Sequence, residues 1–306
     1  MTNEQYIKNL SHPTKIIDVI LDTDAYNEVD DQFAISYMLC HRDRLNIKGF
    51  CAAPFFNNLS ISPADGMNKS YNELFNLIRL AGENDLLDCI YKGSDRYLPD
   101  ENTPVESDAA DFMAKLANDY SPENPLYIVA IGAITNVASA ILKNPAMREN
   151  TVIVWLGGHG THMPNTAEFN MVQDIAAARI IFGCGVPFVQ LPCWGVVDRF
   201  SVSKYELKHF LEGKNDLCDY LAKHTIEIAD KDAHGGFWGR VLWDVTAVAW
   251  LVNDDHRFMD DMLIPSPIPE YDSHYSTDPE RHLMRYVYNI KREPLLFDMF
   301  VKLSSR

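Results

Sequence analysis

Short apolar runs alternate with helix-like segments along about two hundred residues, and this alternation constrains the fold more than any other feature of the chain. Residues 126–131, 151–156 and 187–192 are mostly apolar, as expected of strands that are covered on both faces. Segments with the spacing of amphipathic helices separate these runs. The pattern predicts an α/β fold with an open, mostly parallel sheet, helices on both of its faces and a mainly helical C-terminal third.

The same pattern gives the approximate positions of the elements. A loop through Pro63 and Gly66 is expected, because both residues are typical of turns. Residues 297–303 fit either a strand or a helix. The other predicted strands are at 16–21, at 47–53 and near Ile90, and the predicted helices begin near 30 and cover 70–81, 108–119, 135–142 and 174–182.

The composition is that of a globular, acidic protein. With 306 residues, 47% of them hydrophobic, and no linker or repeat, the chain is expected to form one domain over residues 1–306. The formal net charge of -16 argues against nucleic acid as a partner and suits a small neutral or cationic ligand. No signal peptide and no apolar run of about eighteen residues is evident, so we expect no membrane partner and a cytoplasmic location.

Acidic residues are concentrated at the end of the first apolar run. Five of the ten residues from 22 to 31 are acidic, namely Asp22, Asp24, Glu28, Asp30 and Asp31. Carboxylates this close repel one another unless a multivalent cation neutralises them, and oxygen ligands alone favour calcium or magnesium over zinc or copper. The cluster therefore predicts a site for a hard metal ion. The alternative is that two of these acids cap the following helix and the others are solvated.

Polar or glycine-rich turns recur where predicted strands end, after Leu21, after Ala130 and after Leu156. The carboxyl ends of parallel strands meet at one edge of a sheet, which is where open α/β sheets bind their ligands. A single active site at that edge would explain the recurrence. Each glycine in these turns also has the simpler explanation of a tight turn.

Five segments occur in an order that matches a known enzyme family. They are Asp22-Thr23-Asp24 with Asp30-Asp31, Gly132-Ala133-Ile134-Thr135-Asn136, Leu156-Gly157-Gly158, Glu168-Phe169-Asn170 with Asp174, and Asp244 within Trp-Asp-Val-Thr-Ala. From residue 16 to about residue 252 the chain thereby resembles the nucleoside hydrolase family, the calcium-dependent N-ribohydrolases.

The resemblance implies hydrolysis of the N-glycosidic bond of ribonucleosides, with one calcium ion at the carboxyl edge of the sheet. The metal ligands that it implies are Asp24, Asp31, the backbone carbonyl of Ile131, and Asp244. Asp24 would also act as the general base towards a calcium-bound water. The family further implies a homo-oligomer, either a dimer or a tetramer.

The residues alone leave a simpler interpretation open for Glu168, Asn170 and Asp244, which could cap the helices that follow them. The resemblance instead implies that several polar side chains hydrogen-bond the ribose. The residues that it places around the sugar are Asp30, Asn165, Glu168 and Asn170, with Asp22 in a supporting position. It also implies an active-site asparagine in the region of Asn57 and Asn58, either of which could take that role. Asn27 is an additional polar residue expected in a supporting position near the sugar.

Two departures from the family pattern bear on the substrate. The loop between Asp24 and Asp30 holds five residues where three are usual, so Asn27 and Glu28 could reach the 5′ end of the substrate or only shape the loop. Trp243 stands where many members carry a histidine, and an indole can stack on a base but cannot donate a catalytic proton. Purine-preferring members of the family resemble this chain at this position, so the resemblance implies purine nucleosides as substrates, although Trp243 could also be a core aromatic residue.

Other loops offer further candidates for contact with the leaving base. Phe237 and Trp238 could supply a second aromatic wall or a mobile lid. His159, His162 and His234 are candidate proton donors.

Two other functions fit part of the sequence. Residues 20–26 partly match the motif of haloacid-dehalogenase-like phosphatases, in which Asp22 would be the nucleophile and Asp24 the acid/base. Tyr26 occupies the position that this motif gives to threonine or valine, which argues against it. The other alternative is a catalytically silent nucleoside- or ribose-binding protein that kept the calcium site, and the intact Asp24 argues against it.

Overall fold

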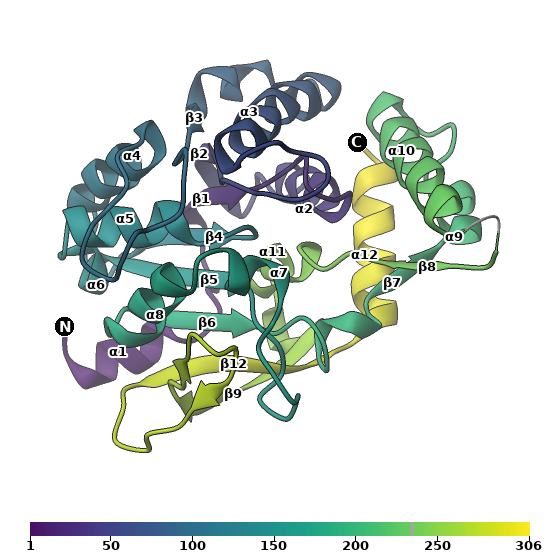
Figure 1. The fold of residues 1–306 in the computed structure, drawn as a ribbon. Helices are drawn as coiled ribbons and strands as arrows, with labels where there is room; N and C mark the ends of the chain where they lie inside the picture. Colours follow the sequence, from purple (N-terminus) through teal and green to yellow (C-terminus); the bar gives the residue numbers. More distant parts are fainter. Residues whose placement is uncertain (234–235) are drawn as a thin grey trace.

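An eight-stranded sheet forms the centre of the structure, a computed structural model that describes residues 1–233 and 236–306 (Figure 1). In this part of the chain the strand order is β3-β2-β1-β4-β5-β6-β12-β9. Neighbouring strands are parallel except for β12 and β9, which are antiparallel. The predicted α/β class with an open, mostly parallel sheet is confirmed.

The first strands of the main sheet lie close to their predicted positions. The fifth strand, predicted at 151–156, has those same bounds. The strands of the main sheet are β1 (Ile17–Thr23), β2 (Leu45–Ala52), β3 (Ile90–Lys92), β4 (Leu126–Ala130), β5 (Thr151–Leu156), β6 (Phe188–Leu191), β9 (Met259–Pro265) and β12 (Leu283–Ile290). Two small antiparallel sheets pair β7 (Ser201–Ser203) with β8 (Gly239–Val241), and β10 (Ile268–Pro269) with β11 (Tyr275–Ser276).

Helices connect most of the strands. In the described residues, none of them combines the length and the apolar character that a bilayer span requires. They are α1 (Asn3–Asn9), α2 (Asp30–Leu39), α3 (Pro63–Leu80), α4 (Asp108–Leu116), α5 (Thr135–Lys143), α6 (Met147–Asn150), α7 (Phe169–Gln173), α8 (Ile175–Gly183), α9 (Lys204–Phe210), α10 (Asp216–Asp232), α11 (Val245–Trp250) and α12 (Arg292–Ser304).

The two faces of the main sheet are buried under different helices. Along β1, Val19 and Leu21 belong to one hydrophobic cluster and Ile20 to the other. Val154 and Trp155 of β5 divide in the same way, because successive side chains of a strand point to opposite faces. Helices α2, α3, α10, α11 and α12 contribute to the first cluster, and α4, α5 and α8 to the second, which confirms helices on both faces (Figure 1).

The C-terminal third is less helical than predicted. It contains α9, α10, α11 and α12, but β9 and β12 extend the main sheet. The periodicity did not reveal β9 because an edge strand is only partly covered: Asp260 and Asp261 interrupt its apolar run, and Met259 alone is fully buried among its residues. Residues 297–303, which fitted either a strand or a helix, belong to α12.

Helix α3 begins earlier than predicted. Pro63 and Gly66, expected in a loop, lie in its first turn, and the Ser62 side chain caps that turn by accepting from the backbone N–H of Asp65. Proline fits there because its missing N–H would have no partner in the first turn. Gly66 is required by close contact, since a Cβ would lie 2.1 Å from the carbonyl oxygen of Phe55.

Hydrogen bonds beyond the strand ends hold the turns of the carboxyl edge together. Ala53 N donates to Thr23 O and Ile131 N donates to Asp22 O, each over 2.8 Å. The turn after β1 is therefore fixed between those after β2 and β4. Helix α11 packs against α2, β4 and β5, and so its first residues reach the same edge.

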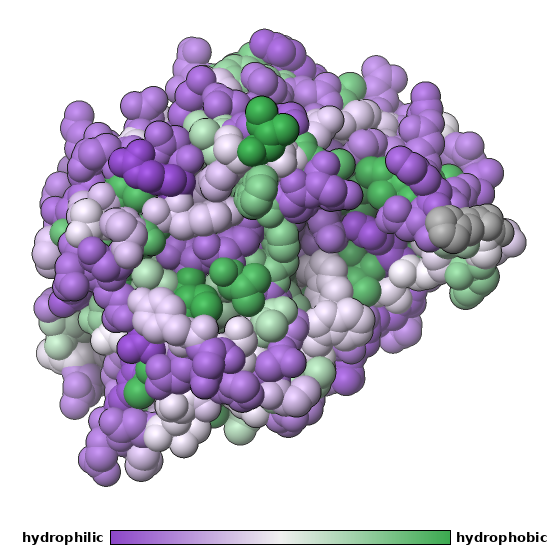
Figure 2. Space-filling model, viewed as in Figure 1, coloured by the Kyte–Doolittle hydropathy of each residue, from purple (hydrophilic) through white to green (hydrophobic). Residues whose placement is uncertain are grey.

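The molecular surface, seen from the same side as in Figure 1, is mostly hydrophilic, with small apolar groups near its middle (Figure 2).

Candidate active site

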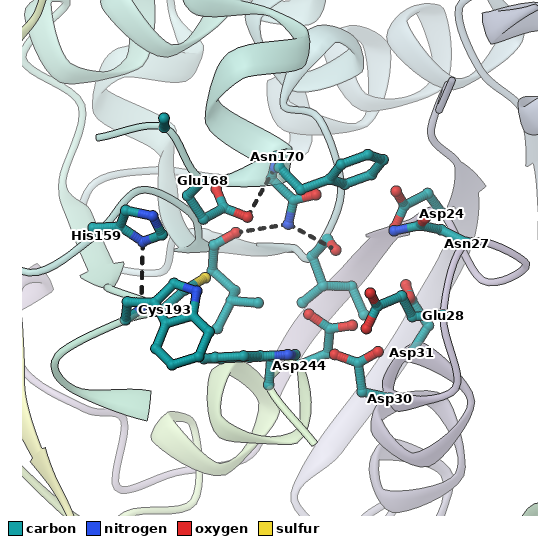
Figure 3. A pocket seen from close by; sticks show the side chains of 16 residues that line it. Asp24, Asn27, Glu28, Asp30, Asp31, His159, Glu168, Asn170, Cys193 and Asp244 are labelled. Carbon is teal, nitrogen blue, oxygen red and sulfur yellow. Dashed lines mark hydrogen bonds between the residues drawn. The ribbon is translucent and has the colours of Figure 1, made fainter. Parts of the chain in front are cut away.

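A cavity of about 270 Å³ opens at the carboxyl edge of the sheet (Figure 3). Its walls come from the turns after β1, β4, β5 and β6 and from the beginnings of α2, α7 and α11. This is the edge where open parallel sheets bind ligands. In the described part of the chain, the lining includes no lysine or arginine but six carboxylates, those of Asp24, Glu28, Asp30, Asp31, Glu168 and Asp244.

Asp24 follows the last residue of β1 and is 1% exposed. Neither of its carboxylate oxygens has a hydrogen-bond partner among the described residues. Burial, and then the charges of Asp31 and Asp30, raise the pKa of Asp24 well above its usual range. Gly132 leaves room for this group, because a Cβ there would lie 3.1 Å from Asp24 Cγ.

Asp30, Asp31 and Asp244 form the tightest group of carboxylates in the cavity. One oxygen from each lies within 4.8 Å of the others. Asp30 and Asp31 begin α2, as predicted, and Asp244 immediately precedes α11. Burial raises the pKa of Asp31 to about 7, although the Thr23 hydroxyl donates to it and opposes the shift. Burial and the charge of Asp30 raise the pKa of Asp244.

These side chains fit a divalent cation. Buried carboxylate oxygens without partners on Asp24 and Asp30 are costly unless a positive charge compensates them. Oxygen donors of this kind suit calcium. The structure brings all the predicted ligands, Asp24, Asp31, Ile131 and Asp244, to the lining of one cavity, and it adds Asp30 to the tightest group.

Asn170 joins the ends of two strands at the floor of the cavity. Its Nδ2 donates to Ile131 O over 3.3 Å and to Leu156 O over 3.1 Å (Figure 3). Ile131 directly follows β4 and Leu156 ends β5, so one amide fixes the distance between two turns of the site. The Ile131 carbonyl is the one that the family resemblance implies as a metal ligand.

Glu168 lies in the same wall and has three backbone partners. Its carboxylate accepts from the N–H groups of Gly158, Asn170 and Met171 over 2.8 to 2.9 Å. Burial raises the pKa of Glu168, and these hydrogen bonds oppose the shift. Glu168 therefore caps α7, which is the simpler role that the sequence left open for it. Contact of Glu168 and Asn170 with a sugar stays a prediction.

Two tryptophans also line the cavity. The rings of Trp243 and Trp194 meet edge to face, with centroids 5.5 Å apart and planes at 62°. Phe237 and Trp238 do not line this cavity: Phe237 is 87% exposed, and Trp238 Nε1 donates to Asp230. The second aromatic wall is thus Trp194, which the sequence analysis missed. Trp194 follows β6, and the end of that predicted strand was the only feature of the local sequence that pointed to this position.

His159 is the candidate proton donor that reaches the cavity. It is 8% exposed, and the backbone N–H of Trp194 donates to its Nδ1 over 3.4 Å (Figure 3). Burial lowers the pKa of His159, and a hydrogen bond with the Ala167 backbone opposes the shift. His162 does not line the cavity. His234 lies outside the described residues.

Other predicted residues lie behind the cavity or beside it. Asp22 is buried, and its carboxylate accepts from Asn136 Nδ2 over 2.8 Å. Asn57 reaches the site indirectly, because its Nδ2 donates to Asn27 Oδ1. Asn165 is exposed and hydrogen-bonds the Ala167 backbone, so the structure does not bring it to the cavity.

Comparison with known proteins identifies the family. A family model described as inosine-uridine preferring nucleoside hydrolase matches residues 19–286. The match extends from the first strand of the main sheet to its last, and it includes every segment on which the resemblance depended.

The names of the curated relatives that the chain matches describe pyrimidine-specific ribonucleoside hydrolases. The pyrimidine-specific ribonucleoside hydrolase RihA of Citrobacter koseri is 32% identical over 158 residues, which cover 50% of this chain and 49% of that protein. A RihA protein of Salmonella agona is 30% identical over 158 residues and is matched to the same extent, 50% of each. The chain thus spans about half the length of the curated relatives it matches.

Solved structures show the same fold over nearly the whole chain. A plant nucleoside hydrolase, the PpNRh1 enzyme, superimposes with a TM-score of 0.76 at 19% identity and covers 96% of this chain and 100% of its own. The purine-preferring ribonucleoside hydrolase of Gardnerella vaginalis gives a TM-score of 0.73 at 20% identity, with 94% and 98% coverage.

Proposed function

Because the chain belongs to the inosine-uridine preferring nucleoside hydrolase family, we propose that it hydrolyses the N-glycosidic bond of ribonucleosides and releases the free base and ribose. The observation that supports this most is the meeting of Asp24, Asp30, Asp31 and Asp244 in one cavity. Uncompensated carboxylates suit both a divalent cation and a sugar that becomes positively charged during reaction.

In this proposal, Asp24, Asp31, Asp244 and the Ile131 carbonyl would hold calcium, the ligand set that the family resemblance implies. When bound, the cation supplies Lewis-acid chemistry that orients the ribose diol and lowers the pKa of a water molecule. Asp24 accepts the proton of the attacking water, since its oxygens have no competing partner among the described residues. Asp30 faces the diol, and its negative charge favours the transition state over the neutral substrate.

The aromatic wall supports purine nucleosides as preferred substrates. Trp243 and Trp194 offer adjoining indole faces and edges to a leaving base, and a larger ring system gains more from stacking. Pyrimidine bases can also stack on these rings, and the RihA relatives are named as pyrimidine-specific enzymes. His159 lies beside this wall, and a hydrogen bond from its ring would stabilise charge on the departing base.

The phosphatase alternative loses its support. Its nucleophile would be Asp22, whose carboxylate is buried, bonded to Asn136 and absent from the cavity lining.

A cytoplasmic location and a dimeric or tetrameric state remain predictions. Light scattering coupled to gel filtration tests the oligomeric state.

The decisive experiment is a screen for release of free base from inosine, adenosine, guanosine, uridine and cytidine, with calcium and with a calcium chelator. We expect release that requires calcium and is faster for the purine nucleosides. The Asp24→Ala variant should lose it, whereas Asp65→Ala, a change on the surface of α3, should keep it. Nucleoside binding without release of any base would instead identify a silent binding protein.

A further inference from the structure

Tyr275, in the β10–β11 hairpin, reaches the back of the candidate active site although it does not line the cavity. Its hydroxyl accepts from Gln190 Nε2 over 2.8 Å, and the same nitrogen donates to Gly157 O over 2.9 Å. Gln190 lies in β6 and is fully buried. One amide thus joins the hairpin to the glycine turn that follows β5.

The hydroxyl of Tyr275 also packs directly against Gly158, the second residue of that turn. A Cβ on Gly158 would lie 2.3 Å from the hydroxyl oxygen, so only glycine leaves room for it. Burial raises the pKa of Tyr275, the hydrogen bond from Gln190 opposes the shift, and the charge of Glu168 adds to it. The hydroxyl therefore keeps its proton at neutral pH.

Gly158 carries the effect of this contact into the cavity. Its backbone N–H donates to Glu168 Oε2 over 2.8 Å, and the same oxygen accepts from Met171 N over 2.9 Å. Glu168 lines the cavity, and it is predicted to contact the ribose. A shift of Gly158 would turn this carboxylate, because Gly158 supplies one of its three backbone hydrogen bonds.

The hairpin itself is held at two points. Arg179 of α8 donates to Pro269 O over 2.7 Å, at the end of β10. In the turn of the hairpin, Ser273 O accepts from Thr166 N over 2.7 Å, which ties this turn to the segment that leads to α7. The position of the Tyr275 hydroxyl is therefore fixed by contacts with two other parts of the fold.

A polar pair at this depth has a cost that apolar side chains would avoid. Gln190 Oε1 is buried and has no partner among the described residues, and an unpaired buried amide oxygen is unfavourable. Apolar side chains of similar size would fill the same space without this cost. The hydroxyl and the amide therefore point to a role in fixing the turn that they contact, rather than in stabilising the core.

We propose that Tyr275 and Gln190 are positioning residues that orient Glu168 for the substrate through the turn at Gly157 and Gly158, a proposal that rests on the proposed function. Gln190 fixes the carbonyl of Gly157, and the Tyr275 hydroxyl supports the Gly158 peptide from behind. The Gly158 N–H then points at Glu168, and the carboxylate keeps one direction towards the cavity. Neither positioning side chain touches the substrate.

The first test is a double-mutant cycle on kcat/KM for the nucleoside that the base-release screen finds to react fastest. Tyr275→Phe keeps the ring and removes the hydroxyl, so kcat/KM should fall about three- to tenfold. In the Glu168→Ala background the same change should cost less than about twofold, because the carboxylate that it orients is absent. Equal losses in the two backgrounds would overturn the proposal, since a general weakening of the fold acts whether or not Glu168 is present.

Tyr271→Phe is the matched control for this cycle. It removes a hydroxyl from the same hairpin, but Tyr271 is exposed and its hydroxyl donates to Glu101 outside the cavity. This variant should keep the kcat/KM of its parent in both backgrounds. A loss equal to that of Tyr275→Phe would assign the effect to the hairpin as a whole and reject the specific role of Tyr275.

The second test is independent of activity. Amide hydrogen exchange, followed by NMR, should become about tenfold faster at Gly158 in Tyr275→Phe and change much less at Val154, in the middle of β5. Unchanged exchange at Gly158, or equal acceleration at both amides, would overturn the proposal. If the wild type releases no base, the proposed function fails separately, and exchange at Gly158 still decides whether Tyr275 holds the turn that binds Glu168.

Discussion

Asn136 Nδ2 donates to Asp22 Oδ1 over 2.8 Å, and this bond joins the beginning of α5 to the end of β1 directly behind the acidic cavity. The same nitrogen lies 3.2 Å from Ala52 O, and Asn136 Oδ1 accepts from Ser94 N over 2.7 Å. One amide thus satisfies groups from the ends of three neighbouring strands. The Asp-Thr-Asp and Gly-x-x-Thr-Asn segments, distant in the sequence, are parts of one support.

Replacement of Asn136 by Ala should destabilise the protein. The change leaves a carboxylate, a carbonyl and an N–H buried without this partner, which costs about 2–4 kcal/mol in the free energy of unfolding. Urea denaturation measures the loss, with Asn102→Ala as the control. A loss below about 0.5 kcal/mol would show that the network is dispensable.

Replacement of Asp24 by Asn should separate catalysis from stability. The variant retains the shape of the side chain but cannot accept a proton, so kcat should fall about 10²- to 10⁴-fold. The metal-free variant should be more stable than the metal-free wild type by about 1 kcal/mol, since one buried, uncompensated charge is removed. Steady-state kinetics measures the expected fall in kcat, and thermal unfolding in chelator measures the expected gain in stability. An unchanged kcat would reject Asp24 as the base.

Calcium should stabilise the protein as well as support activity. A ligand that binds only the folded state at one hundred times its Kd adds about 2.7 kcal/mol to the free energy of unfolding. The Tm should therefore rise by several degrees when calcium is added and return in chelator. Asp244→Asn should reduce this response strongly, and a Tm that ignores calcium in the wild type would argue against the site.

Removal of either tryptophan of the aromatic wall should affect purine nucleosides most. Stacking of a base on an aromatic ring contributes about 1–3 kcal/mol, so Trp194→Ala and Trp243→Ala should each lower kcat/KM for inosine about tenfold or more. The loss for uridine should be smaller, because its base has one ring. Trp238→Ala, which changes a residue outside the cavity, is the matched control. Losses that do not depend on the base would show that the two indoles do not stack on it.

Glu73 should make stability depend on pH. This residue of α3 is buried against α2 and α10, where Gln32 and Tyr220 donate to it. Burial raises its pKa, and the hydrogen bonds from Tyr220 and Asn76 oppose the shift. A carboxyl group with a raised pKa in the folded state contributes stability below its unfolded pKa and loses it as pH rises through the folded value. Compared with the wild type, Glu73→Gln should therefore lose less stability as the pH rises above about 4.3, the usual pKa of an unfolded glutamate. Parallel curves of Tm against pH for the two proteins would contradict this.

The family and most of the first six strands could be predicted because their signals are local. Strands such as residues 151–156 are almost entirely apolar since both faces are covered, and the five acids from Asp22 to Asp31 lie within ten residues of sequence. The edge strand β9 could not be predicted in this way. As an edge strand, β9 is only partly buried, so charged residues are tolerated within it. They interrupt the apolar pattern by which a strand would be predicted.

What the sequence by itself determined is the fold class, the order of the motifs and the acidic turn, because each depends on the spacing of neighbouring residues. Only the tertiary structure decided that Trp194 rather than Phe237 faces Trp243, that Asn165 stays outside the cavity, and that Asn57 orients Asn27. These contacts join loops from different strands. Their geometry depends on strand order and on many small packing and hydrogen-bond energies between residues far apart in the chain, which leave no periodic trace in the sequence.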